Sequence, residues 1–518
     1  MLLHDFLAGS ARSQPDSPAL VFGGVRSRYA EVSRRATALA AHLQSAGVGR
    51  GDRVLIYLDN GVEAVVAFHA ALACGAVAVP VNPSTKAAKL AWLLKDSDAR
   101  ALIAHGPLAD QFRPALTASP WVGTCIVAGR FEEPPSAHTR WTPFDAAEAT
   151  ARPLERPGTI DQDLAAILYT SGSTGEPKGV MLSHLNMLSA ARSVNAYLGY
   201  SAADVILCGL PLSFDYGLYQ VLMAFMVGAS VALERSLAFP AEVVAVLESQ
   251  AVTVLPGVPT VFSMLLGYRP LRERALPALR MITNTAAALP ARHIAELRAL
   301  FPKATLYSMY GLTECKRVTY LPPEELDRRP ASVGRGMPNQ ELWLEDERGH
   351  RLPNGSTGEL IVRGSHVMRG YWRRSEASAE RLKPGPLPGE FVLRSGDIFR
   401  TDEEGYLYFV ARQDDIIKSR GEKVSPREVE NAIYALEGVA EVAVIGVADE
   451  LLGHAVKAVV VLREGFRYTE RDVIRHCLSH LESFMAPKTV SFVAELPQTV
   501  TGKIAKNALK SAGHQKAP

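Results

Sequence analysis

Hydrophobic residues alternate between two spacings along the first half of the chain. Between residues 29 and 46, Val32, Ala36, Leu39 and Leu43 fall on one helical face, and Gly47 follows as a stop. Short continuous apolar runs lie between such helical stretches and predict buried strands. The expected elements are helices at 29–46 and 62–74 and strands at 54–57, 164–169, 202–210, 252–256 and 280–283. Strand and helix in this rhythm predict βαβ units and an α/β fold with layered, mostly parallel sheets covered by helices.

The last hundred residues carry a separate alternation. The apolar pattern predicts strands at 441–447, 455–462 and 489–493 and helices at 426–436 and 470–481. These elements can form a small α+β unit with a core of its own.

Composition narrows the class of protein without naming a chemistry. The chain has 518 residues, 47% of them hydrophobic and 21% charged, which is typical of globular proteins. A net charge of +2 gives no reason to expect nucleic acid or an anionic membrane as a partner. The five cysteines lie far apart without metal-ligand spacing and indicate reduced thiols, so we expect a cytoplasmic protein.

One apolar stretch, at residues 64–81, approaches the length of a membrane span. Gly75 and Pro80 interrupt it, and alternation resumes after Gly75. A buried helix followed by a buried strand explains it, and no integral membrane association is expected. The first residues contain no basic region, and Asp5 breaks their apolar run, so a signal peptide is not expected either.

The segment Thr-Ser-Gly-Ser-Thr-Gly-Glu-Pro-Lys-Gly at 170–179 is the strongest chemical signal in the chain. Its glycines allow backbone N–H groups to approach an anion, its hydroxyl groups add donors, and Lys178 adds a positive charge. Pro177 stands before the lysine where a Walker A loop has glycine. The segment therefore predicts a phosphate-binding loop of another kind, after a buried strand.

This loop resembles the phosphate loop of the adenylate-forming ligases, which include acyl-CoA synthetases, amino-acid adenylation domains and luciferases. Further motifs of that superfamily follow in the expected order: Tyr-Gly-Leu-Thr-Glu at 310–314, Gly-Glu-Leu at 358–360, Gly-Tyr-Trp at 370–372, Ser-Gly-Asp at 395–397, Arg-Gln-Asp-Asp-Ile-Ile-Lys at 412–418 and Thr-Gly-Lys at 501–503. Each short motif is weak by itself, but their order over more than three hundred residues makes the resemblance strong.

The resemblance implies a domain organisation. Residues 1–411 form an N-terminal adenylation domain, 412–415 a hinge, and 416–518 a small mobile C-terminal domain that carries the catalytic lysine. Asp414 matches the hinge position. Ala411 departs from the pattern, because the superfamily has glycine before the arginine.

The resemblance also implies the residues that bind ATP and Mg²⁺. Glu314 would hold Mg²⁺, Thr313 would contact the α-phosphate, and Lys503 would bridge the substrate carboxylate and the α-phosphate as the catalytic cation. Asp397 and Arg412 would grip the ribose. The remaining nucleotide contacts are expected from Thr170, Ser171, Gly172, Ser173, Thr174, Gly175, Lys178, Ala286, Ala287, Tyr310 and Gly311. Thr285 stands where the adenine-binding strand usually begins with glycine.

The resemblance places the acyl pocket around the segment Pro-Leu-Ser-Phe-Asp-Tyr-Gly at 211–217. Its expected lining is Phe214, Asp215, Tyr216, Tyr219 and Met309. Amino-acid adenylation domains use an aspartate after this phenylalanine to pair the substrate ammonium. An unpaired carboxylate in an apolar pocket is costly, so a cationic partner for Asp215 makes physical sense, either from an amino-acid substrate or from Lys316 or Arg317 of the protein. The remaining alternative is a partly solvated aspartate.

The expected activity is that of an AMP-forming ligase. It would activate a carboxylic acid, or an amino acid, with ATP to an acyl-adenylate and release pyrophosphate. It would then transfer the acyl group to the thiol of CoA or of the phosphopantetheine on a separate carrier protein. The alternative is a catalytically silent protein on the same fold that binds nucleotide or acyl ligands for regulation, since fold does not imply function.

Overall fold

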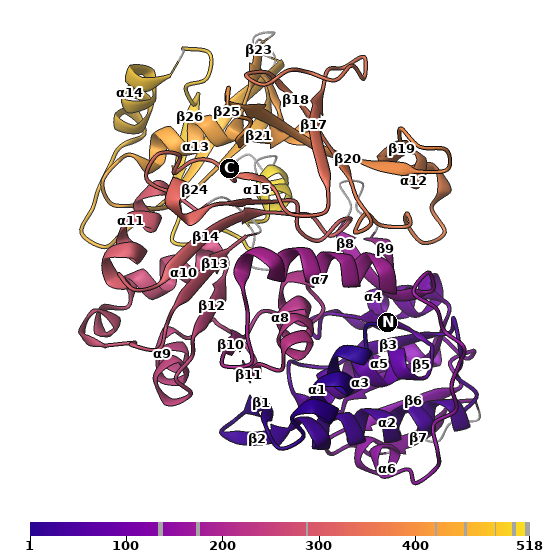
Figure 1. Cartoon of the computed structure of the whole chain (residues 1–518). Helices are drawn as coiled ribbons and strands as arrows, with labels where there is room; N and C mark the ends of the chain where they lie inside the picture. The colour runs from indigo at the N-terminus through magenta and orange to yellow at the C-terminus, as the bar shows by residue number, and fades with distance from the viewer. Residues whose placement is uncertain are drawn as a thin grey trace.

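The computed structural model describes residues 1–132, 138–171, 177–285, 289–419, 422–449, 453–481, 483–499 and 504–512. Two large sheets, a smaller antiparallel sheet and a C-terminal sheet organise the chain (Figure 1). The C-terminal elements, orange to yellow in Figure 1, lie at the opposite end of the molecule from the indigo N-terminal helices. The α/β class predicted from the sequence is confirmed.

The first sheet has the strand order β7-β6-β5-β3-β4-β8-β9. Neighbouring strands are parallel except for the last pair, β8 and β9, which form an antiparallel hairpin around the phosphate loop. Its strands are β3 (Arg53–Tyr57), β4 (Val77–Pro80), β5 (Ala99–His105), β6 (Thr124–Ala128), β7 (Arg140–Pro143), β8 (Leu164–Ser171) and β9 (Pro177–Ser183).

The second sheet has the order β16-β15-β14-β13-β12-β10-β11-β1-β2. It is parallel from β14 to β1 and antiparallel at its two edges. Its strands are β1 (Pro18–Phe22), β2 (Val25–Arg28), β10 (Val205–Cys208), β11 (Ser230–Leu233), β12 (Val254–Gly257), β13 (Met281–Asn284), β14 (Thr305–Tyr310), β15 (Thr319–Leu321) and β16 (Arg335–Gly336).

Helices cover both faces of each large sheet, so that five layers alternate. Successive side chains of β3 show the arrangement: Val54 and Ile56 belong to the core between the two sheets, whereas Leu55 and Tyr57 belong to the core on the outer face. Helices α2, α3, α7 and α8 lie between the sheets, α4 and α5 cover the outer face of the first sheet, and α9, α10 and α11 cover that of the second.

The two helices predicted in this part of the chain, at 29–46 and 62–74, form as α2 and α3 and end within one residue of the prediction. The helices here are α1 (Asp5–Ser13), α2 (Tyr29–Ser45), α3 (Val62–Ala73), α4 (Ala87–Ser97), α5 (Ala109–Thr117), α6 (Phe144–Glu148), α7 (His184–Leu198), α8 (Asp215–Val227), α9 (Pro240–Ser249), α10 (Pro259–Gly267) and α11 (Ala291–Leu300). The apolar stretch at 64–81 forms α3 and β4, as predicted. In the described part of the chain, no helix combines the length and the apolar character needed to cross a membrane.

A third sheet, antiparallel throughout, was not among the predicted elements. It contains β17 (Glu341–Glu345), β18 (Thr357–Arg363), β19 (Leu382–Pro384), β20 (Phe391–Thr401) and β21 (Leu407–Arg412), with α12 (Ser375–Arg381) before β19. Its strands mix buried and exposed positions, as in β20, so they lack the continuous apolar runs that marked the parallel strands.

The C-terminal sheet forms with the predicted alternation. It contains β22 (Ile417–Ser419), β23 (Glu422–Val424), β24 (Val439–Asp449), β25 (Gly453–Leu462) and β26 (Thr489–Phe492), and its helices are α13 (Pro426–Tyr434), α14 (Glu470–His480) and α15 (Lys506–Ala512). Val429, Val444, Val460 and Val473 share a core within these elements. This segment therefore has a packed interior of its own, as the sequence predicted.

Candidate active site

The stems of the phosphate loop are fixed by the β8–β9 hairpin. Thr170 and Lys178 are partners in its register, and the Thr170 hydroxyl donates to the carbonyl of Lys178 at 3.4 Å. The Lys178 side chain is half-buried, with Nζ 5.5 Å from the centre of the Tyr371 ring. The predicted residues Gly172, Ser173, Thr174 and Gly175, and the side chain of Ser171, lie outside the described residues.

Residues 369–372 add a further backbone pairing to β9. The amide of Met181 donates to the carbonyl of Gly370 at 2.9 Å, and the amide of Trp372 donates to that of Gly179 at 2.7 Å. This pairing places Tyr371 beside the stem of the loop. Its hydroxyl donates to Oε1 of Glu314 at 2.7 Å, and burial raises the pKa of Tyr371, so the phenol keeps its proton. Lys178 and Glu314 are thus brought to the same tyrosine.

Glu314 and Thr313 lie on a tight loop between β14 and β15. The amide of Val318 donates to the carbonyl of Tyr310 at 2.9 Å and closes this loop. A Cβ at position 311 would lie 2.2 Å from the carbonyl oxygen of Lys316, so only glycine fits there. The amide of Met368 donates to the carbonyl of Glu314 at 2.8 Å. Gly311 therefore shapes the loop that presents Thr313 and Glu314.

Asp397 and Arg412 face each other across β20 and β21, where they are register partners. The hydroxyl of Tyr310 donates to Oδ2 of Asp397 at 2.5 Å, and Nε of Arg412 lies 3.6 Å from Oδ1. Asp397 is 4% exposed, and burial raises its pKa against the opposing effects of Arg412 and Tyr310. The Tyr310 ring packs edge-on against the Phe399 ring, and the two ring centres are 4.9 Å apart. These contacts join the second and third sheets through one buried carboxylate.

The predicted adenine contacts Ala286 and Ala287 lie outside the described residues. The neighbouring Thr285 is buried, as is the strand β13 that precedes it.

The acyl-pocket residues lie at the start of α8, and a lysine reaches them from the second sheet. Nζ of Lys316 donates to the carbonyl of Asp215 at 2.9 Å and to its Oδ2 at 3.3 Å. The same Nζ lies 4.3 Å from the ring centre of Tyr219 and 5.4 Å from that of Tyr216. Asp215 therefore has a cation supplied by the protein, which is one of the two partners that the sequence left open.

The burial, the backbone conformation and the pKa of Lys316 are all unusual for a lysine. It is 3% exposed, and its backbone is left-handed, with φ +66°. Burial lowers the pKa of Lys316 to about 7, with Arg317 adding to the shift and Asp215 opposing it. Sequence reasoning named Lys316 only as an alternative partner, because nothing in its neighbours showed that the loop would turn it inward.

Met309 and Phe214 complete the predicted lining. Met309 is buried and accepts a hydrogen bond at its sulfur from the Tyr197 hydroxyl at 3.0 Å. The Tyr197 ring stacks on Tyr320 at 4.0 Å, and Phe214 packs edge-on against Tyr216 at 6.4 Å. Tyr197 and Tyr320 were not predicted. Both come from segments without a motif, so only the fold places them beside the pocket.

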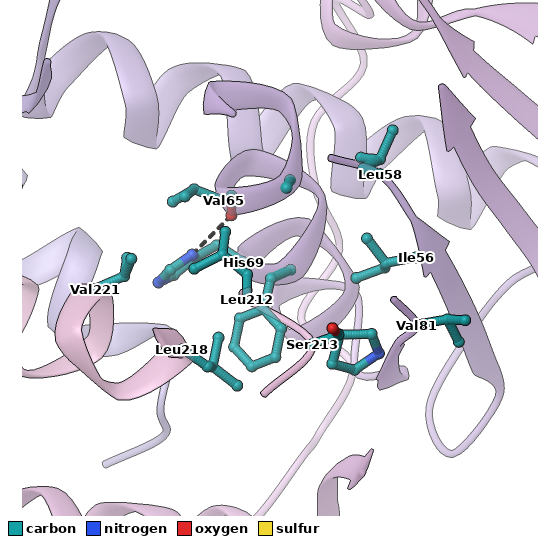
Figure 2. Close-up of a pocket in the computed structure, with 12 residues that line it drawn as sticks. Ile56, Leu58, Val65, His69, Val81, Leu212, Ser213, Leu218 and Val221 are labelled. Carbon is teal, nitrogen blue, oxygen red and sulfur yellow. Dashed lines mark hydrogen bonds between the residues drawn. The ribbon is translucent and has the colours of Figure 1, made fainter. Parts of the chain in front are cut away.

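A small apolar cavity lies on the other side of α8 (Figure 2). Its walls include Ile56, Val65 and His69 from the first sheet and α3, with Leu218 and Val221 from α8, and its volume is about 20 Å³. This is room for about one water molecule, too little for an acyl chain. Nδ1 of His69 contacts the carbonyl of Val65 at 2.9 Å, and burial lowers the pKa of His69 to about 4. The cavity is a packing feature of the interlayer core.

The expected catalytic residue Lys503 lies outside the described residues, but the ends of its segment are fixed. Gln498 and Ile504 form a β-bridge, and the amide of Ala505 donates to the carbonyl of Pro497 at 2.7 Å. Leu496 is buried against the C-terminal sheet. After the segment, Nζ of Lys506 contacts Oε1 of Glu430 at 2.6 Å. The described residues on either side of the predicted lysine are thus anchored to one another and to the C-terminal sheet.

The predicted hinge forms a short 3₁₀ turn, η4 (Gln413–Asp415), directly after β21. Asp414 is its central residue. Nζ of Lys510 lies 3.4 Å from Oδ1 of Asp415, and the Ser425 hydroxyl donates to the carbonyl of Val410 at 2.6 Å. These contacts tie the turn to α15 and to the start of α13. The boundaries 1–411, 412–415 and 416–518 stay a prediction.

Two protein families match consecutive parts of this chain. The family described as AMP-binding enzyme matches residues 7–372, and the one described as AMP-binding enzyme C-terminal domain matches residues 428–503. The feruloyl-CoA synthase of Amycolatopsis sp is 33% identical over 501 residues, with 96% of each chain covered. The long-chain-fatty-acid–CoA ligase of Bacillus subtilis (strain 168) is 30% identical and covers 98% of this chain and 94% of its own.

Solved structures show the same relationship. The crystal structure of ATP-bound MatB from Rhodopseudomonas palustris has a TM-score of 0.88 at 30% identity, with 99% of each chain covered. The apo structure of the same protein has a TM-score of 0.79 at the same coverage. The whole-chain arrangement is therefore closer to the ATP-bound structure.

Proposed function

Because this chain belongs to the AMP-binding enzyme family of adenylate-forming ligases, we propose that it is an AMP-forming acid–CoA ligase. In the first half-reaction, a substrate carboxylate oxygen attacks the α-phosphorus of ATP, and the bond to the bridging oxygen breaks to give acyl-adenylate and pyrophosphate. In the second, the sulfur of CoA attacks the acyl carbon, its proton is lost, and AMP leaves.

The observation that carries this proposal is the meeting of Lys178 and Glu314 at Tyr371. The first half-reaction brings a carboxylate toward a triphosphate, so the site must hold two anions together. Lys178 supplies a cation at the stem of the phosphate loop, and Glu314 supplies a carboxylate at the same place. A protein that only bound an acyl ligand would not need both groups there.

The residues present fit Mg²⁺ as the companion of ATP. Glu314 offers a half-buried carboxylate, one oxygen of which is oriented by the Tyr371 hydroxyl, and carboxylate and phosphate oxygens are the ligands that this cation prefers. When bound, Mg²⁺ would neutralise charge on the phosphates. Tyr371 would keep the Glu314 carboxylate pointed toward the loop, and Thr313 would reach the α-phosphate from the same turn.

Asp397 would accept hydrogen bonds from the ribose hydroxyls, with Arg412 closing over it. Asp397 is already held by Tyr310, so its orientation is set before nucleotide arrives. Lys503 would bridge the acid and the α-phosphate from its short connection on the C-terminal sheet. Such a cation, aimed at the charge that develops, is worth about 3–4 kcal/mol of transition-state stabilisation.

The similarity to CoA synthases and ligases supports CoA, rather than the phosphopantetheine of a carrier protein, as the acceptor. The Asp215–Lys316 ion pair supports an acid without an α-ammonium group. An amino-acid substrate would need the carboxylate that Lys316 already occupies. Among the two substrate classes that the sequence left open, we therefore propose the plain carboxylic acids.

The test is ATP–pyrophosphate exchange with a panel of carboxylic acids and amino acids, followed by AMP and acyl-CoA formation when CoA is added. We expect Mg²⁺-dependent exchange with plain acids. Lys503→Ala should lower the exchange rate about 100- to 1,000-fold, because one preorganised donor to the transition state is lost. Lys488→Ala, an exposed lysine of the same C-terminal segment that pairs with Asp449, is the matched control and should retain full activity.

Three results would contradict parts of this proposal. Exchange that survives in Lys503→Ala would remove that residue from the chemistry. ATP binding without exchange, for every acid tested, would support the catalytically silent nucleotide-binding protein. Exchange with amino acids alone would reverse the assignment of the substrate class.

A further inference from the structure

The guanidinium of Arg317 is buried without a counter-ion. Arg317 is 2% exposed, and its Nε has no hydrogen-bond partner. Within the described residues, the Arg317 side chain forms no hydrogen bond or ion pair. Its guanidinium lies over the Tyr216 ring, with Cζ 5.0 Å from the ring centre. Arginine carries its charge at every physiological pH, so this charge is not removed by loss of a proton.

A buried guanidinium without a counter-ion lowers the stability of the protein unless a ligand pairs with it. Buried charges are normally paired or fully hydrogen-bonded, because removal of an ion from water is not repaid by apolar or aromatic neighbours alone. A ring under a guanidinium returns only a small part of that cost. We therefore expect a ligand to supply the partner that the described residues lack.

Asp215, the carboxylate at the start of α8, does not serve as the counter-ion of Arg317. Asp215 is held by Lys316, which contacts both its carbonyl and its carboxylate. Two cations of the β14–β15 loop, Lys316 and Arg317, thus lie at the start of α8, where Asp215 supplies one carboxylate. Both cations lie against Tyr216, at 5.4 Å and 5.0 Å from its ring centre. Tyr216 is one of the residues expected to line the acyl pocket, so the excess positive charge lies at the wall of that pocket.

We infer that the acyl pocket takes an acid that carries a second anionic group, a dicarboxylic acid, and that Arg317 binds the carboxylate that is not activated. This inference rests on the proposed acid–CoA ligase function and names its substrate class. A planar guanidinium matches a carboxylate in two parallel hydrogen bonds, which gives the pocket a geometric as well as an electrostatic preference.

The position of Arg317 in the chain supports this assignment. It follows Glu314 by three residues on the closed loop between β14 and β15. One end of the loop therefore serves the nucleotide phosphates and the other end the distal end of the acid. The left-handed backbone of Lys316, between them, turns two consecutive cations into the interior. Strain of this kind is found where a site requires it.

The experiment compares matched acids on the full chain with ATP and Mg²⁺. Short linear and aromatic dicarboxylic acids are each paired with their monoamide and with the monocarboxylic acid of equal length. We expect kcat/KM in ATP–pyrophosphate exchange to be about 10- to 100-fold higher for the dicarboxylic acid than for either partner, as for a hydrogen bond to a charged group. A monoamide as good as the diacid would overturn the inference, because charge would not be recognised.

Three variants identify the residue. Arg317→Gln should abolish the preference for the diacid while exchange with monocarboxylic acids continues, and Arg317→Lys should restore part of the preference. The control is Arg280→Gln, which removes an arginine that pairs with Asp204 elsewhere on the second sheet and should leave the preference unchanged. A preference that survives in Arg317→Gln would overturn the inference.

Two further readouts separate this inference from the proposed function. Calorimetric titration of the diacid and monoamide measures recognition without catalysis. Binding of the diacid that is lost in Arg317→Gln, without any exchange, would overturn the ligase function and support the anion site. Exchange with plain acids alone, unchanged in Arg317→Gln, would do the opposite.

Thermal unfolding without ligand gives the second readout. Arg317→Met should raise the Tm, because it removes a buried charge that lacks a partner, whereas a merely structural arginine would lower the Tm when replaced. A lowered Tm in Arg317→Met would therefore count against the inference.

Discussion

The predicted nucleotide side of the site, around Glu314 and Asp397, and the predicted acyl side, around Asp215, differ in how their buried charges are paired. On the nucleotide side, each carboxylate has a tyrosine that donates to it: Tyr371 to Glu314 and Tyr310 to Asp397. On the acyl side, Asp215 pairs with Lys316, and among the described residues Arg317 contacts only the Tyr216 ring. The first arrangement is complete before any ligand binds and is suited to a constant ligand, ATP. The second leaves a charge unmatched, and we propose that this charge favours one class of acid over another.

Two arginines make the contrast clear. Arg412 is 61% exposed and approaches Asp397 at 3.6 Å, so water and a carboxylate share its solvation. Arg317 is almost fully buried and has neither. An exposed ion pair contributes little to stability, whereas a buried unpaired charge lowers it. Position in the fold, rather than residue type, therefore decides what each arginine does.

The largest effect is expected from breaking the buried pair on the acyl side. Asp215→Ala leaves Lys316 and Arg317 together without a carboxylate, in an environment that both share with Tyr216 and Tyr219. We expect the free energy of unfolding to fall by about 3–5 kcal/mol, the usual cost of an uncompensated buried charge. Urea denaturation of the ligand-free protein measures it.

The double variant Asp215→Leu/Lys316→Met is the control for this prediction. It removes both members of the pair, keeps the volume, and should recover most of the lost stability. If the single and the double variants were equally destabilised, the loss would come from packing at the start of α8 and not from charge.

A smaller effect is expected on the nucleotide side, where Tyr371→Phe removes the hydroxyl that holds Glu314. A hydrogen bond to a charged group is worth about 1.5–3 kcal/mol, so we expect the exchange rate at limiting Mg²⁺ to fall roughly 10- to 100-fold. The measurement is exchange as a function of Mg²⁺ concentration, and the concentration at half-maximal rate should rise.

A second tyrosine provides a matched control for that variant. The Tyr169 hydroxyl donates to Asp96 at 2.6 Å, on the same strand as the stem of the phosphate loop but away from Glu314. Tyr169→Phe should lower stability by a similar small amount without changing the Mg²⁺ requirement. An equal change in both variants would show that the tyrosines act only through the stability of the hairpin.

The two sides also differ in how far the sequence could predict them. Glu314, Asp397 and Lys178 could be proposed because each stands in a short motif that resembles one of the adenylate-forming ligases, and their roles stay predictions. The alternation of strands and helices likewise predicted mostly parallel sheets, several of their strands and most of the C-terminal elements. These features depend on local residue order, which a sequence displays directly.

The remaining features depend on contacts between distant segments. Nothing near Tyr371 in the sequence shows that residues 369–372 would pair with β9 and reach Glu314. The antiparallel third sheet was missed because its longest strand, β20, mixes buried and exposed positions, and β18 contains only a short apolar run at 360–362. The sequence names Arg317 only as a possible partner of Asp215, and the turn at Lys316 that leaves Arg317 buried without that partner was not predicted.

The smallest effect on stability is expected from Arg412→Ala, the exposed counterpart of Arg317. Its ion pair with Asp397 is long and open to solvent, so the free energy of unfolding should change by less than about 1 kcal/mol. The KM for ATP should rise in the same variant, because Arg412 would close over the ribose. Denaturation and exchange kinetics on one preparation measure both quantities. A large loss of stability with unchanged KM would make Arg412 structural and would end the contrast with Arg317.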